Sequence, residues 1–184
     1  HISLIKKSKN SSDKTLVSIF INPTQFNNKN DYKRYPKNLK QDINTLIKNK
    51  IDYLLLPSFK ELYGTRKVKK EKLAKKDVIL CAKFRKGHFQ GVLTVINQFL
   101  KKLNIKKIYF GEKDYQQLFL IRKFIKKKRF KINVISCKTI RQKNYFPYSS
   151  RNKLLSKSSI INGQRVSLIL NKLYLEIKKN KKRN

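Results

Sequence analysis

The apolar residues of the chain follow two different periods, and segments of the two kinds alternate along the sequence. Short runs rich in β-branched and aromatic residues predict strands, and segments with an apolar residue every three or four positions predict helices. The predicted strands are 16–21, 51–56, 105–110 and 132–137. The predicted helices are 38–50, 88–103, 115–128 and 158–179, with a short helical turn at 59–63. This alternation predicts an α/β fold in which a parallel sheet carries helices on both faces.

The segments between these elements are mostly polar, and we expect irregular structure in them. Residues 31–36 predict a polar loop, and residues 67–76 predict a solvated loop or a frayed helix. Residues 77–82 suit either a strand or a helix end. The lysine-rich tail is expected to be disordered, because like charges repel and few apolar residues are present to form a core. A chain of 184 residues can bury one core, so a single main domain is the simplest organisation.

The charge of the chain limits the classes of partner. It has 47 Lys and Arg residues against 10 Asp and Glu, which gives a net charge of +37. Such an excess often indicates binding to nucleic acid or to an anionic surface. Here the basic residues are spread along the chain, and the sequence favours residues with A/T-rich codons, which accounts for much of the charge. Nucleic acid is therefore not the expected partner, although the charge should attract anionic substrates.

Cysteine content and hydropathy indicate the compartment. Cys81 and Cys137 each lie inside or beside an apolar run, so we expect two buried free thiols rather than a disulfide or a metal site. No apolar run reaches the length of a membrane span, and no secretory signal opens the given sequence. We expect a soluble, cytoplasmic protein without a membrane partner.

The strongest candidate for a ligand site is the segment Gly111-Glu112-Lys113-Asp114-Tyr115-Gln116-Gln117, which follows a predicted strand and opens a predicted helix. Ligands of open α/β sheets bind at this edge, and a helix N-terminus favours anions. The spacing alone fits a phosphate-bearing ligand and a solvated turn equally well. Three further polar segments stand at the ends or starts of predicted elements: Asn22-Pro23-Thr24-Gln25-Phe26, Arg85-Lys86-Gly87-His88-Phe89 and Ser149-Ser150-Arg151-Asn152.

Together these segments resemble the pantothenate synthetase (pantoate–β-alanine ligase) family of the HIGH-motif nucleotidyltransferase superfamily. SIFINPTQF, GEKDYQQL and SSRN occur in the family's order and at its spacings, and the resemblance extends from His1 to about Leu155. It implies a Rossmann-like domain over 1–157 that binds ATP and pantoate, and a C-terminal helix with a basic tail over 158–184 as a remnant of the family's lid domain. His1 matches the second histidine of the family's His-x-Gly-His turn. We therefore expect the family's first strand and most of its lid to be missing here.

The resemblance implies an ATP-dependent ligase that condenses pantoate with β-alanine through pantoyl adenylate and releases AMP and pyrophosphate. Because an anionic carboxylate must approach a triphosphate, cations and N–H groups are needed to hold the phosphates. The residues implied to be catalytic are His1, Lys113 and Arg151. Those implied to bind ATP are Gly111, Glu112, Lys113, Asp114, Ile140, Tyr148, Ser149, Ser150 and Arg151. Those implied to bind pantoate or β-alanine are Asn22, Gln25, Arg85, His88 and Gln117.

The uncharged amides of Gln25 and Gln117 suit an acid, because they bind its oxygens and leave its carboxylate reactive. Two other residues also have a structural interpretation: Asn22 could instead cap the strand end, and His88 could serve the start of its helix. Magnesium is expected to arrive with ATP rather than at a protein site, since Asp42 offers a single carboxylate.

One segment departs from the family pattern. The chain reads Asn144-Tyr145-Phe146-Pro147-Tyr148 where the family has Asp-Gly and small apolar residues, and this bulk should alter the wall beside the adenine. The resemblance implies pantoate, β-alanine and ATP as small-molecule partners, together with a homodimer. Two other functions stay open: a non-catalytic fragment that retains nucleotide binding, and a basic nucleic-acid-binding protein on the same scaffold.

Overall fold

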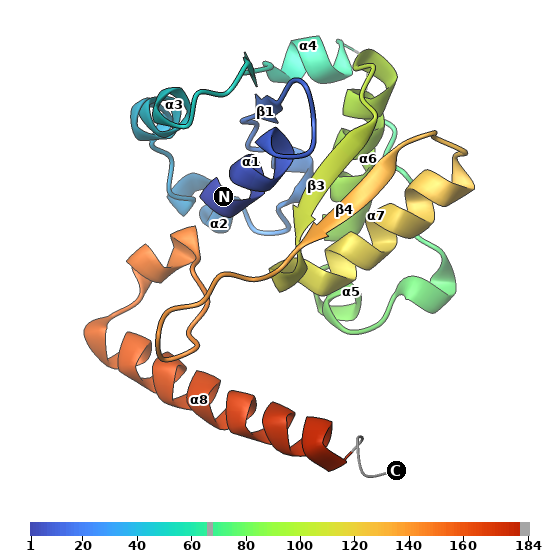
Figure 1. Ribbon diagram of the computed structural model, residues 1–184. Helices are drawn as coiled ribbons and strands as arrows, with labels where there is room; N and C mark the ends of the chain where they lie inside the picture. The colour runs from blue at the N-terminus through green and yellow to red at the C-terminus, as the bar shows by residue number, and fades with distance from the viewer. Residues whose placement is uncertain (66–67, 181–184) are drawn as a thin grey trace. The chain divides into compact units, whose positions relative to one another are not determined.

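The computed structural model describes residues 1–65 and 68–180, which form a mixed α/β structure (Figure 1). The chain divides into two compact units, His1–Cys137 and Lys138–Asn184. The functional division expected after residue 157 stays a prediction. All strands of the described chain belong to the first unit, where they alternate with helices, and this confirms the predicted α/β class.

The first unit contains two parallel pairs of strands. β1 (Leu16–Ser18) pairs with β2 (Tyr53–Leu55), and β3 (Lys107–Gly111) pairs with β4 (Asn133–Cys137). The four predicted strands are therefore present and parallel, but they form two two-stranded sheets instead of one continuous sheet. β1 and β2 are shorter than predicted. Beyond Ser18 the ladder continues only through the N–H of Ile19, because the partner strand runs into Pro57, which has no N–H to donate.

In the described part of the first unit, seven α-helices connect or flank these strands. They are α1 (Ile2–Lys9), α2 (Lys29–Arg34), α3 (Leu39–Lys48), α4 (Phe59–Tyr63), α5 (Cys81–Phe84), α6 (His88–Lys102) and α7 (Tyr115–Lys127). The predicted helices at 38–50, 59–63, 88–103 and 115–128 are confirmed. The polar loop expected over 31–36 is wrong. Asn28 caps α2 by accepting the N–H of Asn30 at 2.7 Å, and Asp31 lies in the first turn, where the helix dipole favours a negative charge.

The core of the first unit lies between α6, α7 and one face of the β3–β4 pair (Figure 1). Its buried members include Val92 and Ile96 of α6 and Ile121 of α7, and Ile108 of β3 packs against them. The opposite face of β3 carries Tyr109, whose hydroxyl bonds to serine hydroxyls just after α1 at 2.8 and 3.0 Å. Helices therefore lie on both faces of this pair, as predicted.

The connection before α5 is only partly solvated, which corrects part of the prediction for 67–76. The N–H of Glu71 donates to Thr94 Oγ1 at 2.8 Å, and the Glu71 carboxylate accepts Asn97 Nδ2 at 2.8 Å. Asp77 is buried and pairs with Lys123 at 2.6 Å. These polar groups can be buried because α6 and α7 supply partners for them. Residues 66 and 67 lie outside the described part of the chain.

Cys81 is exposed, and the expectation that it is buried is wrong. It lies in the four-residue helix α5, which turns Ala82 inward and Cys81 outward. Residues 78–80 before it are irregular, so the uncertain segment 77–82 is not a strand. Cys137 is buried, as expected.

The second unit consists of a loop closed by the antiparallel bridge between Arg141 and Pro147, the short 3-10 helix η4 (Ser150–Leu154) and the long helix α8 (Lys157–Asn180). The predicted helix over 158–179 is confirmed, with Lys178 and Lys179 in its last turn. Residues 181–184 lie outside the described range. No residue of α8 is buried. Across residues 1–65 and 68–180, we find no helix that combines the length and the apolar character needed to span a bilayer.

Candidate functional site

Residues 111–114 lie where β3 passes into α7. β3 ends at Gly111, a 3-10 turn covers Glu112–Asp114, and α7 begins at Tyr115, so the positive end of a helix dipole faces this junction. Lys113 Nζ lies 3.2 Å from the Asp114 carboxylate, and the two side chains are 40% and 60% exposed. An exposed pair of this kind contributes little stability, so Lys113 can exchange it for a more highly charged anion.

The segment after β1 turns through a 3-10 helix, η1 (Pro23–Gln25), whose N-cap is Asn22. The Asn22 side chain is buried, with an exposed fraction of 1%. Its Oδ1 accepts the Thr24 N–H at 3.2 Å, the Thr24 hydroxyl at 2.9 Å and the Tyr63 hydroxyl at 3.0 Å. Its Nδ2 donates to the carbonyl of Gly91 at 3.1 Å. Asn22 therefore caps the turn and links it to both α4 and α6.

The first turn of α6 contacts the same segment. Gly87, which precedes the helix, has a left-handed φ of +81°. His88 is buried, and its Nδ1 lies 2.7 Å from the carbonyl oxygen of Gln25. Because a carbonyl oxygen can only accept, Nδ1 must carry the proton of this bond. Arg85 lies between α5 and α6 as the C-cap of α5.

Tyr63 is a residue of this cluster that sequence reasoning missed. Burial raises the pKa of its hydroxyl, and hydrogen bonds with Thr24 and Asn22 act in the opposite direction, so the hydroxyl is protonated at neutral pH and donates to Asn22. The signal that could have found it is the capping box at Ser58 and Glu61, which fixes α4 and therefore the position of Tyr63.

The structure brings Asn22, Gln25 and His88 into one bonded cluster, and it places 111–114 and Gln117 together at the start of α7. Gln117 is half-buried. His1 is exposed at the N-cap position of α1, where its carbonyl accepts the N–H groups of Leu4 and Ile5. The catalytic arrangement of these groups around ligands stays a prediction.

The remaining predicted residues belong to the second unit. Ser149 caps η4, because its Oγ accepts the N–H of Arg151 at 3.3 Å, and Ser150 is the first residue of that helix. Tyr148 donates its N–H to the carbonyl of Ile140 at 3.3 Å. These two side chains are 60% and 52% exposed, so the unit presents an apolar pair next to the serines. Phe146 of the departing segment lies against the glycine at position 163 of α8.

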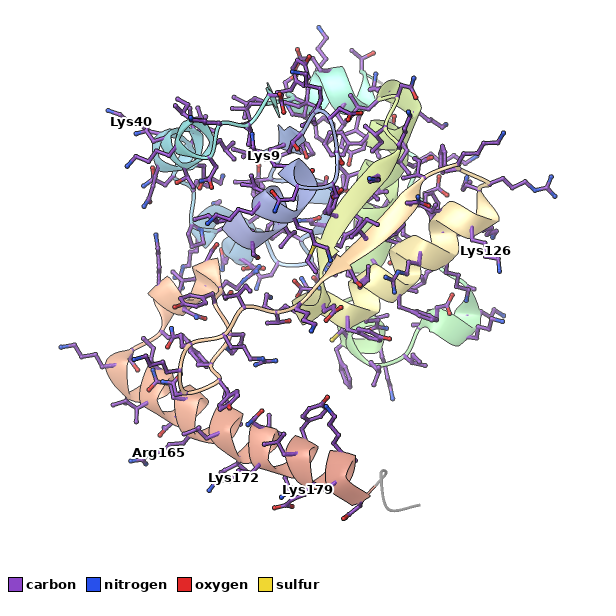
Figure 2. The ribbon with its side chains drawn as sticks, in the orientation of Figure 1. Lys9, Lys40, Lys126, Arg165, Lys172 and Lys179 are labelled. Carbon is purple, nitrogen blue, oxygen red and sulfur yellow. The ribbon has the colours of Figure 1, made fainter. Side chains whose placement is uncertain are left out.

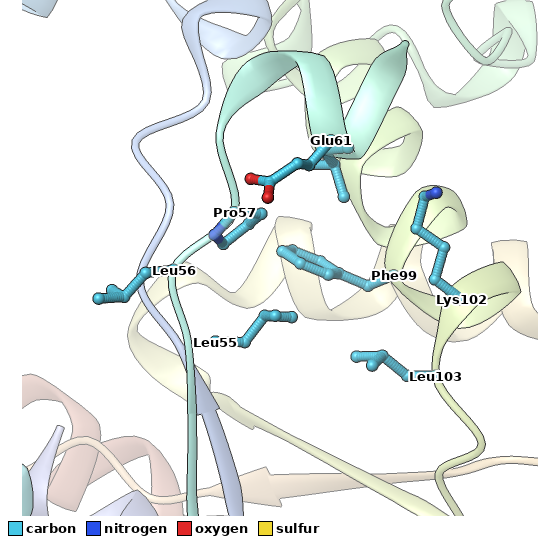
Figure 3. A pocket seen from close by; sticks show the side chains of 8 residues that line it. Leu55, Leu56, Pro57, Glu61, Phe99, Lys102 and Leu103 are labelled. Carbon is cyan, nitrogen blue, oxygen red and sulfur yellow. The ribbon is translucent and has the colours of Figure 1, made fainter.

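A hollow at the end of β2 lies apart from these residues (Figure 3). It has a volume of about 190 Å³, and Figure 3 shows Leu55, Phe99 and Leu103 pointing into it. Pockets for drug-sized ligands span roughly 300–1,000 Å³, so this hollow is too small for a nucleotide. Its lining contains none of the predicted site residues.

Among residues 1–65 and 68–180, no group of three His, Cys, Asp or Glu side chains is arranged to hold an ion. Asp42, the single carboxylate considered for magnesium, is exposed in the first turn of α3.

Comparison with known proteins agrees with the sequence motifs. The family model described as Pantoate-beta-alanine ligase matches residues 1–183. Pantothenate synthetase of Francisella philomiragia subsp. philomiragia is 45% identical over 174 residues, which cover 92% of this chain and 66% of that protein.

Solved structures give the same result. A pantoate-beta-alanine ligase of Francisella tularensis, crystallised in complex with beta-gamma ATP and beta-alanine, has a TM-score of 0.88 and 43% identity, and the match covers 92% of this chain and 66% of that chain. Pantothenate synthetase of Thermus thermophilus has a TM-score of 0.88 and 29% identity, over 99% of this chain and 65% of that one. The chain thus spans about two thirds of the length of these relatives.

Proposed function

The chain belongs to the pantoate-beta-alanine ligase family, and on that premise we propose that it condenses pantoate with β-alanine in a reaction driven by ATP. The observation that carries the proposal is the β3–α7 junction, where Lys113 is exposed, weakly paired and next to a helix N-terminus. The ATP and β-alanine complex of the Francisella tularensis relative supports the same substrates.

The first step activates the acid. A carboxylate oxygen of pantoate attacks the α-phosphorus of ATP, a P–O bond forms, and the bond to the β-phosphate breaks, so that pyrophosphate leaves with the electron pair. Lys113 follows the charge that develops on the leaving group, and the N–H groups at the start of α7 stabilise the phosphates. Arg151 with its serine neighbours, and His1 at the start of α1, supply further donors to the phosphates.

The second step forms the amide. The uncharged amine of β-alanine attacks the acyl carbon of pantoyl adenylate, a C–N bond forms, the C–O bond to AMP breaks, and the amine loses its proton to water. Gln25 and Gln117 orient the pantoyl group through amide hydrogen bonds, which leave the acyl carbon electrophilic. Arg85 and His88 are assigned to the end of the site that receives pantoate and β-alanine.

Two assignments concern the nucleotide. Ile140 and Tyr148, whose side chains are exposed, are assigned to the adenine. Gly111 has open space where a Cβ atom would lie, so the ribose can approach its backbone closely, beside Glu112 and Asp114. Magnesium accompanies ATP as its counterion.

AMP release measures this function directly. We expect AMP to appear only when ATP, pantoate and β-alanine are all present, and we expect Lys113→Ala to lower kcat by about 100-fold or more, because a cation at a developing charge is worth several kcal/mol. Lys126→Ala, an exposed lysine in the last turn of α7, is the matched control and should keep wild-type activity. Stabilisation by ATP without any AMP release would assign a non-catalytic nucleotide-binding function instead.

We further propose a cytoplasmic homodimer. The two free cysteines suit a reducing compartment. Exposed apolar side chains of Ile79, Phe84 and Phe119 offer a surface for a second copy, and Gln116 joins their two segments by donating to the Ile79 carbonyl at 2.8 Å. Light scattering after gel filtration should give twice the monomer mass, and the double variant Phe84→Lys with Phe119→Lys should give the monomer mass. A wild-type monomer would refute the dimer and leave the ligase function unaffected.

A further inference from the structure

The turn that presents Gln25 is held from two sides by groups distant in the sequence. On one side, the Tyr63 hydroxyl of α4 donates to Asn22 Oδ1 at 3.0 Å. On the other, His88 Nδ1 of α6 donates to the Gln25 carbonyl oxygen at 2.7 Å. The two donors therefore hold the first and last parts of the segment 22–25.

The turn also lies unusually close to the helix. A Cβ atom on Gly91 would lie 2.4 Å from the carbonyl oxygen of Thr24 and 2.8 Å from the Cα of Gln25. Only a glycine at this position of α6 permits that distance, and the Gly91 carbonyl accepts Asn22 Nδ2 at 3.1 Å. The backbone of the turn is therefore seated on α6, and two side-chain hydrogen bonds define where it sits.

The two donors are buried to different degrees. His88 is 7% exposed, whereas Tyr63 is half-buried, with its ring centroid 4.8 Å from that of Phe59 and 6.3 Å from that of Phe20. Hydrogen bonds in such surroundings are stronger than in water. Loss of His88 removes the donor to the Gln25 carbonyl, whereas loss of the Tyr63 hydroxyl removes the bond from α4 to Asn22 Oδ1, which keeps its two bonds from Thr24. Neither bond involves residues 111–114, which carry the proposed phosphate contacts.

We propose that Tyr63 and His88 are positioning residues, which act on the hydroxy acid through Gln25 and set the affinity for the acid rather than for ATP. The inference rests on the ligase function proposed above and assigns Tyr63 a role in it. It also gives His88 a different role from direct contact with substrate: its Nδ1 proton is used by the Gln25 carbonyl. The acid is recognised by the Gln25 amide, whose backbone these two donors hold.

Substitutions at the two positions distinguish loss of the hydrogen-bond donor from loss of side-chain packing. Tyr63→Phe removes one hydroxyl and keeps the packed ring. His88→Leu removes the donor, whereas His88→Asn restores an N–H close to the Nδ1 position and should rescue. Tyr109→Phe is the matched control, because it removes a tyrosine hydroxyl that bonds to serine hydroxyls near α1, on another part of the unit.

Hydrogen exchange of the peptide that covers 22–26 tests the positioning role without any enzymatic activity. We expect exchange there to be about tenfold faster in Tyr63→Phe and His88→Leu, and to be as in the wild type in His88→Asn and Tyr109→Phe. Wild-type exchange in both Tyr63→Phe and His88→Leu would overturn the positioning role.

Steady-state kinetics tests the consequence for the acid. In Tyr63→Phe and His88→Leu we expect KM for pantoate to rise about tenfold and KM for ATP to change less than twofold. Equal increases for both substrates would overturn the assignment to the acid. If the wild-type chain neither binds pantoate nor releases AMP, the ligase function fails together with the role in acid affinity, and the exchange result still decides whether the two donors hold the turn.

Discussion

Gly91 and Gly111 are the same residue type but differ in what an added methyl group would meet. At Gly91 a Cβ atom would lie 2.4 Å from the Thr24 carbonyl oxygen, and its neighbours are backbone atoms, which cannot move aside by rotation of a side chain. At Gly111 nothing lies within 4 Å. We therefore expect Gly91→Ala to lower the free energy of unfolding by about 1–3 kcal/mol or more, and Gly111→Ala to change it by about 0.5 kcal/mol at most.

Urea unfolding followed by circular dichroism measures both values. The same two variants separate stability from binding, because Gly111→Ala should retain its fold and lose part of the thermal stabilisation that ATP gives the wild type. If Gly91→Ala were as stable as the wild type, the segment 22–26 could move away from α6 without lowering the free energy of unfolding. The close approach of the two backbones would then not contribute to stability.

The contribution of the Asp52 carboxylate to stability should depend on pH. Its carboxylate accepts the N–H of Thr15 at 2.9 Å and the ammonium of Lys14 at 3.1 Å, and these bonds connect the starts of β1 and β2. The Thr15 N–H, followed by Lys14, lowers the pKa of Asp52 below its ordinary value. Because the folded pKa lies below the unfolded value of about 3.9, the stabilisation is complete above that value and is lost as the pH falls through the folded pKa.

We therefore expect Asp52→Asn to lower the melting temperature at pH 7, and we expect the difference from wild type to shrink below about pH 4. Thermal melts between pH 7 and pH 3 measure it. Asp13→Asn makes the same change of charge at an exposed position nearby and serves as the control. A difference that is constant over this range would mean that the Asp52 charge does not stabilise the strand pair.

At the level of elements, the periodicity of apolar residues predicts the helices that carry an apolar stripe. The helices beginning at Leu39, His88 and Tyr115 carry an apolar stripe, and they were predicted within a few residues of their ends. α2 was missed because its residues KNDYKR have no such stripe. That helix depends on its cap and on Phe26, whose ring lies 5.2 Å from that of Tyr32.

In the candidate site, too, some residues could be recognised from the local sequence and others could not. Gly111 to Gln117 could be recognised from the sequence because a strand end, a turn and a helix start are consecutive. The contacts of Asn22 could not, because they join residues 41 and 69 positions apart, Tyr63 and Gly91, and no local pattern encodes which segments meet. Cys81 was misplaced for a related reason: its apolar neighbours suggested burial, whereas α5 is too short to bury more than one of its faces.

The two cysteines should differ in their rates of alkylation. Cys137 ends β4 beside Gly111 and is 4% exposed, and burial raises the pKa of its thiol, whereas Cys81 is exposed on α5. Because the thiolate is the reactive form, we expect iodoacetamide at pH 8 to alkylate Cys81 at least about tenfold faster than Cys137 in the native protein. Peptide mass spectrometry gives the two rates, and urea should equalise them. Rapid native labelling of Cys137 would show that the end of β4 opens readily.

For the whole molecule, the dominant feature is a net charge of +37, from basic residues that are spread along the sequence. Within the first unit, Figure 2 shows Lys9, Lys40 and Lys126 on three different helices, α1, α3 and α7. Ion pairs such as that of Lys123 with the buried Asp77 neutralise a few of these charges, but the acidic residues number only 10 in the chain. Most basic side chains therefore repel one another, and this repulsion opposes the compact state.

Added salt should relieve this repulsion and stabilise the fold. The Debye length falls from about 10 Å at 0.1 M to about 3 Å at 1 M ionic strength, so neighbouring lysines interact less as salt rises. We expect the melting temperature to increase by roughly 3–6 °C between 50 and 300 mM NaCl, which corresponds to about 1–2 kcal/mol for a chain of this size. Scanning fluorimetry measures the shift, and KCl at equal ionic strength should reproduce it, since screening depends on ion charge and concentration. A melting temperature that is constant or falls with both salts would mean that attractive pairs outweigh the repulsion.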